Sequence, residues 1–325
     1  MRTPQAPIGS GFGAYTTAAE VIRGIDLTGK NVIVTGGYSG IGLETVRAFR
    51  SAGARVIVPA RDIAKAKASL SDMPDVLLDT MDLLDPSSID AFADRFLSRF
   101  DMLHILVNNA GIMATPLERD ERGYESQFAA NHLGHFQLVC RLWPALVRAE
   151  GARVVALSSY AHRRAGIDFH DLNFEQREYN PWAAYGQSKT ANALFAVALD
   201  SIGEPYGVRA FSVHPGGIAT DLQRHLTKSE IDSLDIIDKS GKPIIDPDNN
   251  RKTPQQGAAT SVWCATSPKL DFLGGVYCAD CDIALALPSD ESTEMHGVRP
   301  RAFDPVAAGR LWQLSEQLTG TKLTD

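Results

Sequence analysis

A glycine-rich turn between an apolar run and a helical stretch is the feature that most constrains the fold of this 325-residue chain. Residues 32–34 (Val-Ile-Val) suit a strand that is buried on both faces, as in a parallel sheet. Glycines at positions 36, 40 and 42 follow, and a helix is predicted over residues 43–52, ended by Gly53. Such glycines let the backbone approach a pyrophosphate, and the helix N-terminus supplies free N–H groups. The spacing is G-x-x-x-G-x-G rather than the G-x-G-x-x-G dinucleotide fingerprint, so a plain glycine turn is the alternative.

Strand-like and helix-like stretches alternate with short links along the rest of the chain. Further strands are predicted over residues 56–58, 76–78, 103–107, 154–157, 208–213 and 275–278, and the main helices over 16–23, 86–100, 123–150, 181–202, 254–266 and 305–318. Pro144 should kink or break the third of these helices. The alternation favours one doubly wound α/β domain of the Rossmann type, with a parallel sheet of about seven strands and helices on both faces.

The two ends of the chain and one internal segment depart from this pattern. We expect residues 1–26 to form an N-terminal leader and a short helix, and residues 27–325 to form the Rossmann-type domain. The charged segment of about 222–252 is expected to be a substrate lid rather than part of the core.

Composition excludes several classes of function. The net charge of −7 and the scattered basic residues argue against a nucleic-acid partner. No apolar run reaches the ~20 residues of a membrane helix, and the N-terminal residues lack the apolar core of a secretory signal. Four cysteines are too few for a disulfide scaffold in a chain of this length. We therefore expect a cytoplasmic protein with reduced thiols and no membrane span.

Tyr185 and Lys189 stand four residues apart on the predicted helix that begins after Asn180. Positions i and i+4 share one face of a helix, so the phenol and the ammonium point in the same direction. A phenol has a pKa of roughly 10, and a nearby positive charge lowers it toward the working pH. A tyrosine in this setting can pass a proton to or from an alcohol oxygen. Because such pairs are usually surface neighbours, the rest of the chain decides the interpretation.

The ends of two predicted strands carry polar residues. Arg61 follows the second strand, where an NAD site usually has an acidic residue for the ribose 2′-hydroxyl. A basic residue there would accept a 2′-phosphate, which favours NADP and leaves NAD as the alternative; an ordinary exposed arginine is the other interpretation. Residues 108–111 (Asn-Asn-Ala-Gly) follow the fourth strand, at the sheet edge where ligands bind in open α/β folds.

Several short motifs within about residues 28–221 resemble those of the short-chain dehydrogenase/reductase family and stand in that family's order. They are Thr35-Gly36-x-x-x-Gly40-x-Gly42, Asn108-Asn109-Ala110-Gly111, Asn131, Ser159, Tyr185-x-x-x-Lys189 and Pro215-Gly216. Residues 16–21 and 127–136, and the long interval between Ser159 and Tyr185, are most similar to the retinol-dehydrogenase and WW-domain-oxidoreductase branch.

The resemblance implies a catalytic set and a cofactor site. Tyr185 would be the general acid/base, and Lys189 would lower its pKa and bind the nicotinamide ribose. Ser159 would bind the substrate oxygen, and Asn131 would hold a water that links Lys189 to solvent. The implied cofactor-binding residues are Gly36, Ser39, Gly40, Ile41, Gly42, Arg61, Asp82, Leu83, Asn109, Ala110, Gly111, Tyr185, Lys189, Pro215, Gly216, Ile218 and Thr220. Many NADP-preferring relatives carry a basic residue where Ser39 stands, so the NADP preference rests on Arg61.

The implied activity is that of an NADP-dependent oxidoreductase that interconverts an alcohol and a ketone or aldehyde by hydride transfer, acting on a small apolar substrate. The alternatives are a catalytically weak nucleotide-sensing or scaffold protein on the same fold, and a lyase or isomerase that uses the cofactor transiently. Relatives often pair through their long central helices, which allows a homo-oligomer.

No metal site is expected. Cys278 and Cys281 have the spacing of half a zinc site, but a second ligand pair is missing nearby. His132 and His135 are expected to pack in the core or shape the pocket wall. Trp182 and Phe174 either line an apolar pocket or anchor the loop of residues 160–180.

Overall fold

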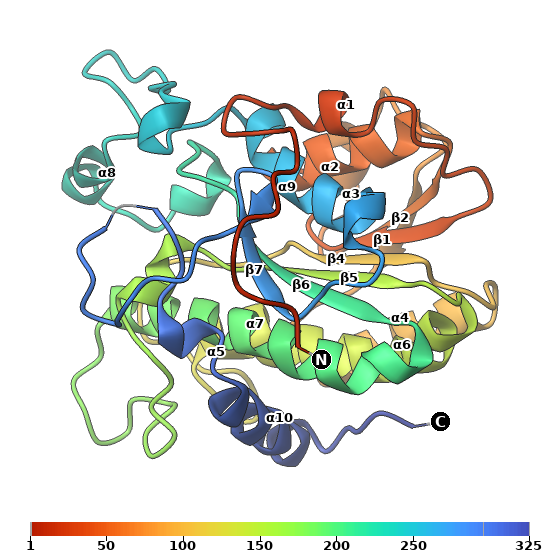
Figure 1. Ribbon diagram of the computed structural model, residues 1–325. Coiled ribbons are helices and arrows are strands. Elements are labelled where there is room, and N and C mark those ends of the chain that lie inside the picture. Colours follow the sequence, from red (N-terminus) through yellow and green to blue (C-terminus); the bar gives the residue numbers. More distant parts are fainter. Residues whose placement is uncertain (1, 295, 325) are drawn as a thin grey trace.

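An eight-stranded sheet forms the centre of the molecule in the computed structural model, which describes residues 2–294 and 296–324 (Figure 1). The strands run in the order β3-β2-β1-β4-β5-β6-β7-β8, and all neighbours are parallel except β8, which is antiparallel to β7. They are β1 Asn31–Val34, β2 Arg55–Ala60, β3 Leu77–Thr80, β4 Ile105–Asn108, β5 Arg153–Leu157, β6 Arg209–His214, β7 Val276–Ala279 and β8 Asp282–Ile283. The predicted doubly wound sheet is confirmed, and β8 is the strand that the sequence pattern missed.

Helices cover both faces of this sheet. They are α1 Ala18–Val21, α2 Gly40–Ser51, α3 Ile63–Ser69, α4 Pro86–Leu97, α5 Ser126–Phe128, α6 Gly134–Arg148, α7 Pro181–Gly203, α8 Lys228–Leu234, α9 Pro254–Thr266 and α10 Pro305–Thr319. In Figure 1, α4, α6, α7 and α10 lie below the sheet, while α1, α2 and α9 lie above it. Strands β1, β4, β5 and β6 are buried throughout, since apolar side chains of successive positions enter the two cores alternately.

The helix that carries Tyr185 begins where the sequence predicted. Asn180 Oδ1 accepts the N–H groups of Trp182 and Ala183, and Pro181 occupies the first turn. From Ala184 onward α7 is almost wholly buried, because it packs on β5 and β6 on one side and on α10 on the other. This packing brings Tyr185 to the carboxyl end of the sheet.

The long helix expected over residues 123–150 is divided. A π-helical turn, Ala129–Leu133, separates α5 from α6, and Asn131 lies within it. The helix does not break at Pro144, which lies inside α6 with the helix continuing to Arg148. Single π-turns of this kind occur frequently at functional sites, and this one sets the position of Asn131.

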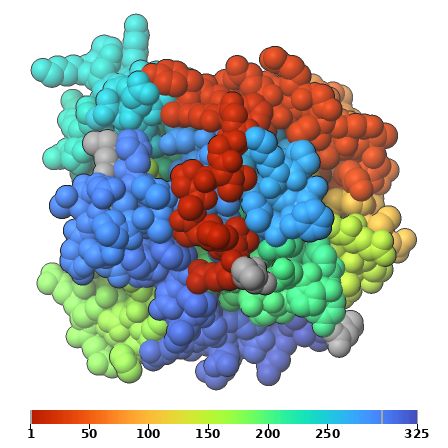
Figure 2. Space-filling view, in the orientation of Figure 1, coloured from red at the N-terminus to blue at the C-terminus, as the bar shows by residue number. Residues whose placement is uncertain are grey.

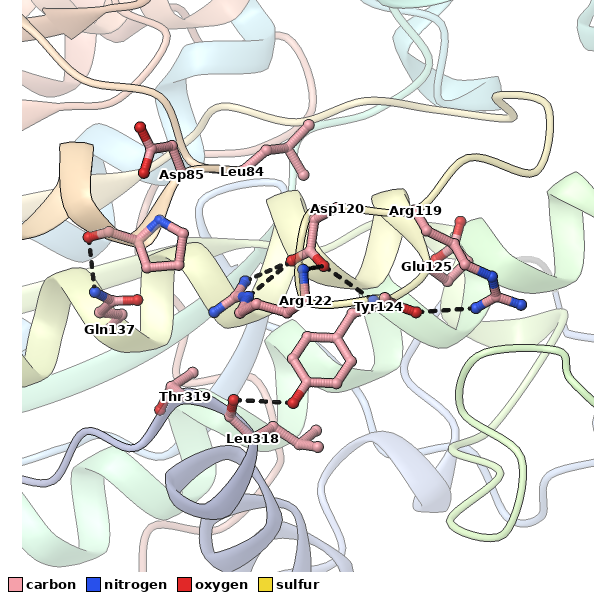
Figure 3. Close-up of polar contacts among 12 residues, drawn as sticks. Leu84, Asp85, Arg119, Asp120, Arg122, Tyr124, Glu125, Gln137, Leu318 and Thr319 are labelled. Atoms are coloured by element: carbon pink, nitrogen blue, oxygen red, sulfur yellow. Dashed lines mark hydrogen bonds and ion pairs between the residues drawn. The ribbon is translucent and has the colours of Figure 1, made fainter.

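The segment that leads into α5 is fixed by polar contacts (Figure 3). The Asp120 carboxylate accepts the backbone N–H groups of Arg122 and Tyr124 at 3.0 and 2.9 Å. The Tyr124 hydroxyl donates to the Leu318 carbonyl of α10 at 3.1 Å. Glu125 then caps α5 by accepting the first N–H groups of that helix. These contacts hold the start of the segment that contains Asn131.

The N-terminal leader bonds to β7 and β8, and in Figure 2 it is the dark-red strip that crosses the centre of the molecule between blue C-terminal segments. The Gln5 side chain bonds the backbone N–H and C=O of Tyr277 and the carbonyl of Ala284. The Asp282 carboxylate accepts the backbone N–H groups of residues 8–10. The leader therefore satisfies polar groups at an otherwise open edge.

The segment predicted as a lid projects from the carboxyl end of the sheet (Figure 1). It contains α8, none of whose residues is buried. The segment returns to the domain where Gly217 N–H donates to Asn250 O at 2.7 Å and Lys252 N–H donates to Gly217 O at 2.9 Å. The role of this segment as a lid stays a prediction.

Candidate active site

The glycine-rich turn joins β1 to the start of α2 with unoccupied backbone donors. Ser39 occupies the N-cap position, and its side chain makes no capping bond, so the first N–H groups of α2 are free to bind a ligand. Gly40 has a φ of +50°, and a Cβ on Gly42 would overlap the Gly36 carbonyl oxygen. These glycines are thus required by the turn itself, and the turn presents the N-terminus of α2 to an anion.

A chain of hydrogen bonds ties this turn to the end of β4. The Thr35 hydroxyl oxygen accepts the N–H groups of Asn109 and Ala110 at 2.9 and 3.0 Å. His135 Nε2 lies 2.9 Å from the same hydroxyl, and His135 Nδ1 lies 3.0 Å from the Asn131 carbonyl. A carbonyl only accepts, so Nδ1 carries the proton and Nε2 accepts from Thr35. Burial lowers the pKa of His135 to about 4, which keeps it neutral in this role.

A cavity of about 480 Å³ opens along this edge of the sheet. The predicted cofactor residues that line it are Gly36, Ser39, Gly40, Ile41, Gly42, Arg61, Asp82, Leu83, Asn109, Ala110, Gly111, Tyr185, Lys189, Pro215 and Thr220. Gly216 and Ile218 are not among the lining residues. Gly216 lies against the Lys252 side chain, and Ile218 lies close to Gly257 of α9.

Arg61 lies in the cavity wall at the end of β2, and sequence reasoning missed the cations beside it. Lys65 of α3 and Arg224 also line the cavity. Lys65 Nζ lies 3.5 Å from an Asp221 carboxylate oxygen at the start of the lid segment. The available signal was Asp62, whose side chain caps α3 by accepting the N–H of Lys65. The weakly apolar sequence of α3 hid this helix.

The π-turn directs the Asn131 side chain at the loop that follows β4. Its Oδ1 accepts the Ile112 N–H, and its Nδ2 donates to the Ile112 carbonyl, both at 2.9 Å. Nδ2 also lies 2.9 Å from Ser188 Oγ of α7. Asn131 therefore couples this loop to the helix that carries Tyr185 and Lys189.

Lys189 is a buried cation held by a backbone carbonyl. Its Nζ donates to the Leu157 carbonyl at 2.9 Å and lies 5.6 Å from the centre of the Tyr185 ring. Its residue is only 4% exposed, and burial lowers the pKa of the amine from 10.5 to about 7.

The Tyr185 phenol is also buried, with Ser159 beside it. Burial raises the pKa of Tyr185 to about 12, and a hydrogen bond with Ser159 offsets only part of that rise. The net pKa of Tyr185 therefore lies above its ordinary value, and the expectation that Lys189 lowers it stays a prediction. Burial penalises the phenolate and the ammonium alike, and the amine is directed at the Leu157 carbonyl.

An apolar wall surrounds Tyr185. Met113, Ala114 and Ala161 form a buried cluster with the tyrosine, and Trp182, Leu222 and Leu226 pack against it. The two leucines come from the lid segment, where sequence reasoning placed no site residue. An amphipathic stretch from Leu226 to Ile237 was the available signal for Leu226, whereas Leu222 lies outside it. Trp182 thus belongs to the pocket, with its ring centre 6.4 Å from that of Tyr185.

Several other candidates are accounted for by packing. Phe174 lies at a φ of +55° under the Arg177 guanidinium and against Tyr179, which makes it an anchor of the loop. His132 Nε2 lies 2.7 Å from Ser315 Oγ of α10 in the core. Cys278 and Cys281 are buried free thiols. In residues 2–294 and 296–324, no group of three or more His, Cys, Asp or Glu side chains is placed to hold a metal ion.

Comparison with known proteins gives consistent results. A family model described as short chain dehydrogenase matches residues 30–231. A probable oxidoreductase of Streptomyces antibioticus is 42% identical over 89% of this chain and 97% of its own length. Human retinol dehydrogenase 12 is 38% identical over 92% of this chain and 89% of its own length. The WW domain-containing oxidoreductase of Pongo abelii is 36% identical over 96% of this chain and 73% of its own length.

Two solved structures have a fold similar to that of this chain. An uncharacterised protein from Mycobacterium paratuberculosis superposes with a TM-score of 0.72 at 32% identity, covering 96% of this chain and all of the other. The Pseudomonas aeruginosa RhlG/NADP active-site complex superposes with a TM-score of 0.60 at 25% identity, covering 78% and 95%. Within the described ranges, no helix has both the length and the apolar character to cross a membrane. The match of the family model over most of the sheet, together with these relatives, shows that the chain belongs to the short-chain dehydrogenase family.

Proposed function

We propose that this protein is an NADP-dependent oxidoreductase that interconverts an alcohol and a ketone or aldehyde, with Tyr185 as the general acid/base. One observation carries the proposal: a single cavity is lined both by the glycine-rich turn and Arg61 and by Tyr185 and Lys189. A dinucleotide placed along it would have its phosphates at the N-terminus of α2 and its reactive end beside the tyrosine.

The residues present fit such a cofactor. The free N–H groups at the start of α2 suit a pyrophosphate, and residues 109–111 would meet the ribose. Arg61 and Lys65 supply positive charge where a 2′-phosphate would lie, and the structural relative bound to NADP supports this choice over NAD. When bound, the nicotinamide supplies the redox step by accepting or donating the hydride.

The protein's own residues would handle the proton and the substrate oxygen. Ser159 Oγ accepts the Ala161 N–H at 3.1 Å, and its hydroxyl proton would pass from the Tyr185 oxygen to a substrate oxygen as its acceptor. Tyr185 would give its proton to a carbonyl oxygen or take one from an alcohol. Lys189 would steady the phenolate, and Asn131 would connect Lys189 to solvent through a water. The apolar wall of Met113 and its neighbours favours a small or medium uncharged substrate.

Replacement of Tyr185 tests this proposal. We expect Tyr185→Phe to fold, to bind NADPH, and to lose at least ~10²-fold in kcat on octanal, the usual share of general acid–base catalysis. Tyr124→Phe removes a hydroxyl that bonds the Leu318 carbonyl, on a residue that does not line the cavity, and serves as the control. Near-normal turnover by Tyr185→Phe would refute the assignment of the general acid. NADPH binding without turnover of octanal, cyclohexanone or benzaldehyde by the wild type would instead indicate a nucleotide-sensing or scaffold protein.

Localisation and assembly complete the proposal. The four cysteines are free and buried, which supports a reducing compartment such as the cytoplasm. Helix α10 packs on α7, and its Trp312 ring lies 4.8 Å from that of Phe136 in α6 and 5.9 Å from that of Phe195 in α7. A homo-oligomer that pairs through the central helices would therefore have to accommodate α10 in its interface.

A further inference from the structure

His162 lies directly behind Ser159 and is fully buried. Its Nδ1 is 2.7 Å from the Ser159 carbonyl oxygen, and its backbone N–H reaches the same oxygen at 3.1 Å. Its Nε2 is 3.3 Å from the backbone N–H of Arg299. The imidazole thus bridges the loop that carries Ser159 and a C-terminal segment about 140 residues further along the chain.

The hydrogen bonds define the state of this imidazole. The Ser159 carbonyl only accepts, so Nδ1 carries a proton, and the Arg299 N–H only donates, so Nε2 is bare. The ring is therefore neutral and satisfied on both sides. Burial lowers the pKa of His162 to about 4, and the positive charges of Arg163, Arg299 and Arg301 act in the same direction.

The same segment is clamped around the loop by other contacts. Arg299 donates to the Arg163 carbonyl at 2.6 Å, and Arg163 donates to the Gly297 carbonyl at 2.7 Å. On the opposite side the loop lies tightly on α7, where a Cβ on Gly186 would come within 2.7 Å of the Ala161 carbonyl oxygen. The Ser159 peptide is consequently held between α7 and the C-terminal segment, and His162 supplies the side-chain contact to its carbonyl.

We propose that His162 is a positioning residue, which fixes the Ser159 peptide so that the serine hydroxyl faces the substrate oxygen beside Tyr185. The inference rests on the proposed function. Ser159 Oγ is oriented by the Ala161 N–H, so rotation of the peptide between them would turn the hydroxyl away. His162 is absent from the cavity lining, and its Nδ1 also lies 3.3 Å from the Tyr277 hydroxyl, so its proposed effect on the reaction passes through Ser159.

Two replacements separate the two ends of the ring. In His162→Asn, the amide nitrogen can stand near the place of Nδ1 and keep the bond to the Ser159 carbonyl. In His162→Gln, the amide oxygen can stand near the place of Nε2 and keep the bond to the Arg299 N–H. With octanal and NADPH, we expect His162→Gln to lose about 10- to 100-fold in kcat, the scale of a misplacement of about 1 Å, with the KM for NADPH unchanged. We expect His162→Asn to stay within about threefold of the wild type, because it restores the positioning bond.

A double-mutant cycle with Ser159→Ala distinguishes positioning from general support of the fold. If His162 acts through the serine hydroxyl, His162→Gln should cause no further loss of kcat in the Ser159→Ala background. An equal further loss in that background, or equal losses in the Asn and Gln variants, would overturn the inference. If His162→Gln does not fold, His162→Asn decides alone, since its near-normal kcat supports the inference and its loss refutes it.

The proposed function is tested separately in the same assay. Loss of turnover in Tyr185→Phe with full activity in His162→Gln would remove only the role of His162. Absence of turnover in the wild type would remove both.

Discussion

The buried amine of Lys189 should lower the free energy of unfolding of this protein. Burial lowers the pKa of its amine from 10.5 to about 7, and in the described part of the chain no carboxylate opposes this shift. The unfolded chain binds the proton up to 10.5 and the folded chain only up to about 7, so stability rises with pH between these values. The destabilisation is fully present below about pH 7 and amounts to about 5 kcal/mol as an upper bound.

We therefore expect Lys189→Met to be more stable than the wild type while losing activity. The Leu157 carbonyl that Lys189 binds stays satisfied, because Asn192 Nδ2 also donates to it at 2.9 Å. Allowing about 1 kcal/mol for the lost hydrogen bond, the gain should be about 2 to 4 kcal/mol near pH 6. It should shrink by up to about 2.5 kcal/mol by about pH 9, because the folded chain has released its proton there while the unfolded chain still holds most of its own. Urea denaturation of both proteins at the two pH values, without added nucleotide, measures this difference.

A second buried lysine provides the control. Lys252 is 3% exposed but is ion-paired with Asp280, so Lys252→Met removes this ion pair and should give no comparable gain in stability. If Lys189→Met were less stable than the wild type at both pH values, or if its gain did not fall as pH rises, the buried amine would not be the source of the destabilisation.

Three further replacements test the cavity, the loop contact and the core. Arg61→Ala should raise the KM for NADP by about tenfold or more and spare that for NAD, as expected for one lost charge-assisted bond; an unchanged ratio of the two would remove the reason for choosing NADP. Gly186→Ala should lower kcat by about tenfold or more without changing NADPH binding, because its Cβ would push against the Ala161 carbonyl. Gly309→Ala, in open space on α10, is the control, and an equal kcat for the two variants would contradict the argument. Trp312→Ala should cost about 3 to 5 kcal/mol in urea denaturation, and a loss below about 1 kcal/mol would show that α10 is not part of the core.

The elements that the sequence predicted well are those whose signals are local. The buried strands were recognisable as short runs of Val and Ile, and α7 by Asn180 and Pro181 at its start. The glycine-rich turn was recognisable because each glycine is required by backbone geometry. The elements that were missed have weak local signals. Strand β8 has two residues, and α3 buries only Ala66.

Features that depend on tertiary contacts could not be read in this way. The π-turn around Asn131 is a shift of hydrogen-bond register that no residue preference announces. Leu222 and Leu226 reach the pocket only because the lid segment folds back over Tyr185. Lys65 lines the same cavity as Arg61 because α3 begins shortly after β2 ends and packs on β3.

The pKa of Tyr185 shows why residue spacing fixes the members of a site but not their state. The i, i+4 relation placed the phenol and the ammonium on one helix face, and the structure agrees. Their charges, however, depend on burial and on the acceptor that each donor finds, and both are properties of the surrounding chain. Lys189 is directed at the Leu157 carbonyl, and burial favours the uncharged form of each group: it raises the pKa of the phenol and lowers that of the amine. A positive charge brought into the cavity would lower the pKa of the phenol, so we expect proton transfer at Tyr185 to depend on what occupies the nucleotide site.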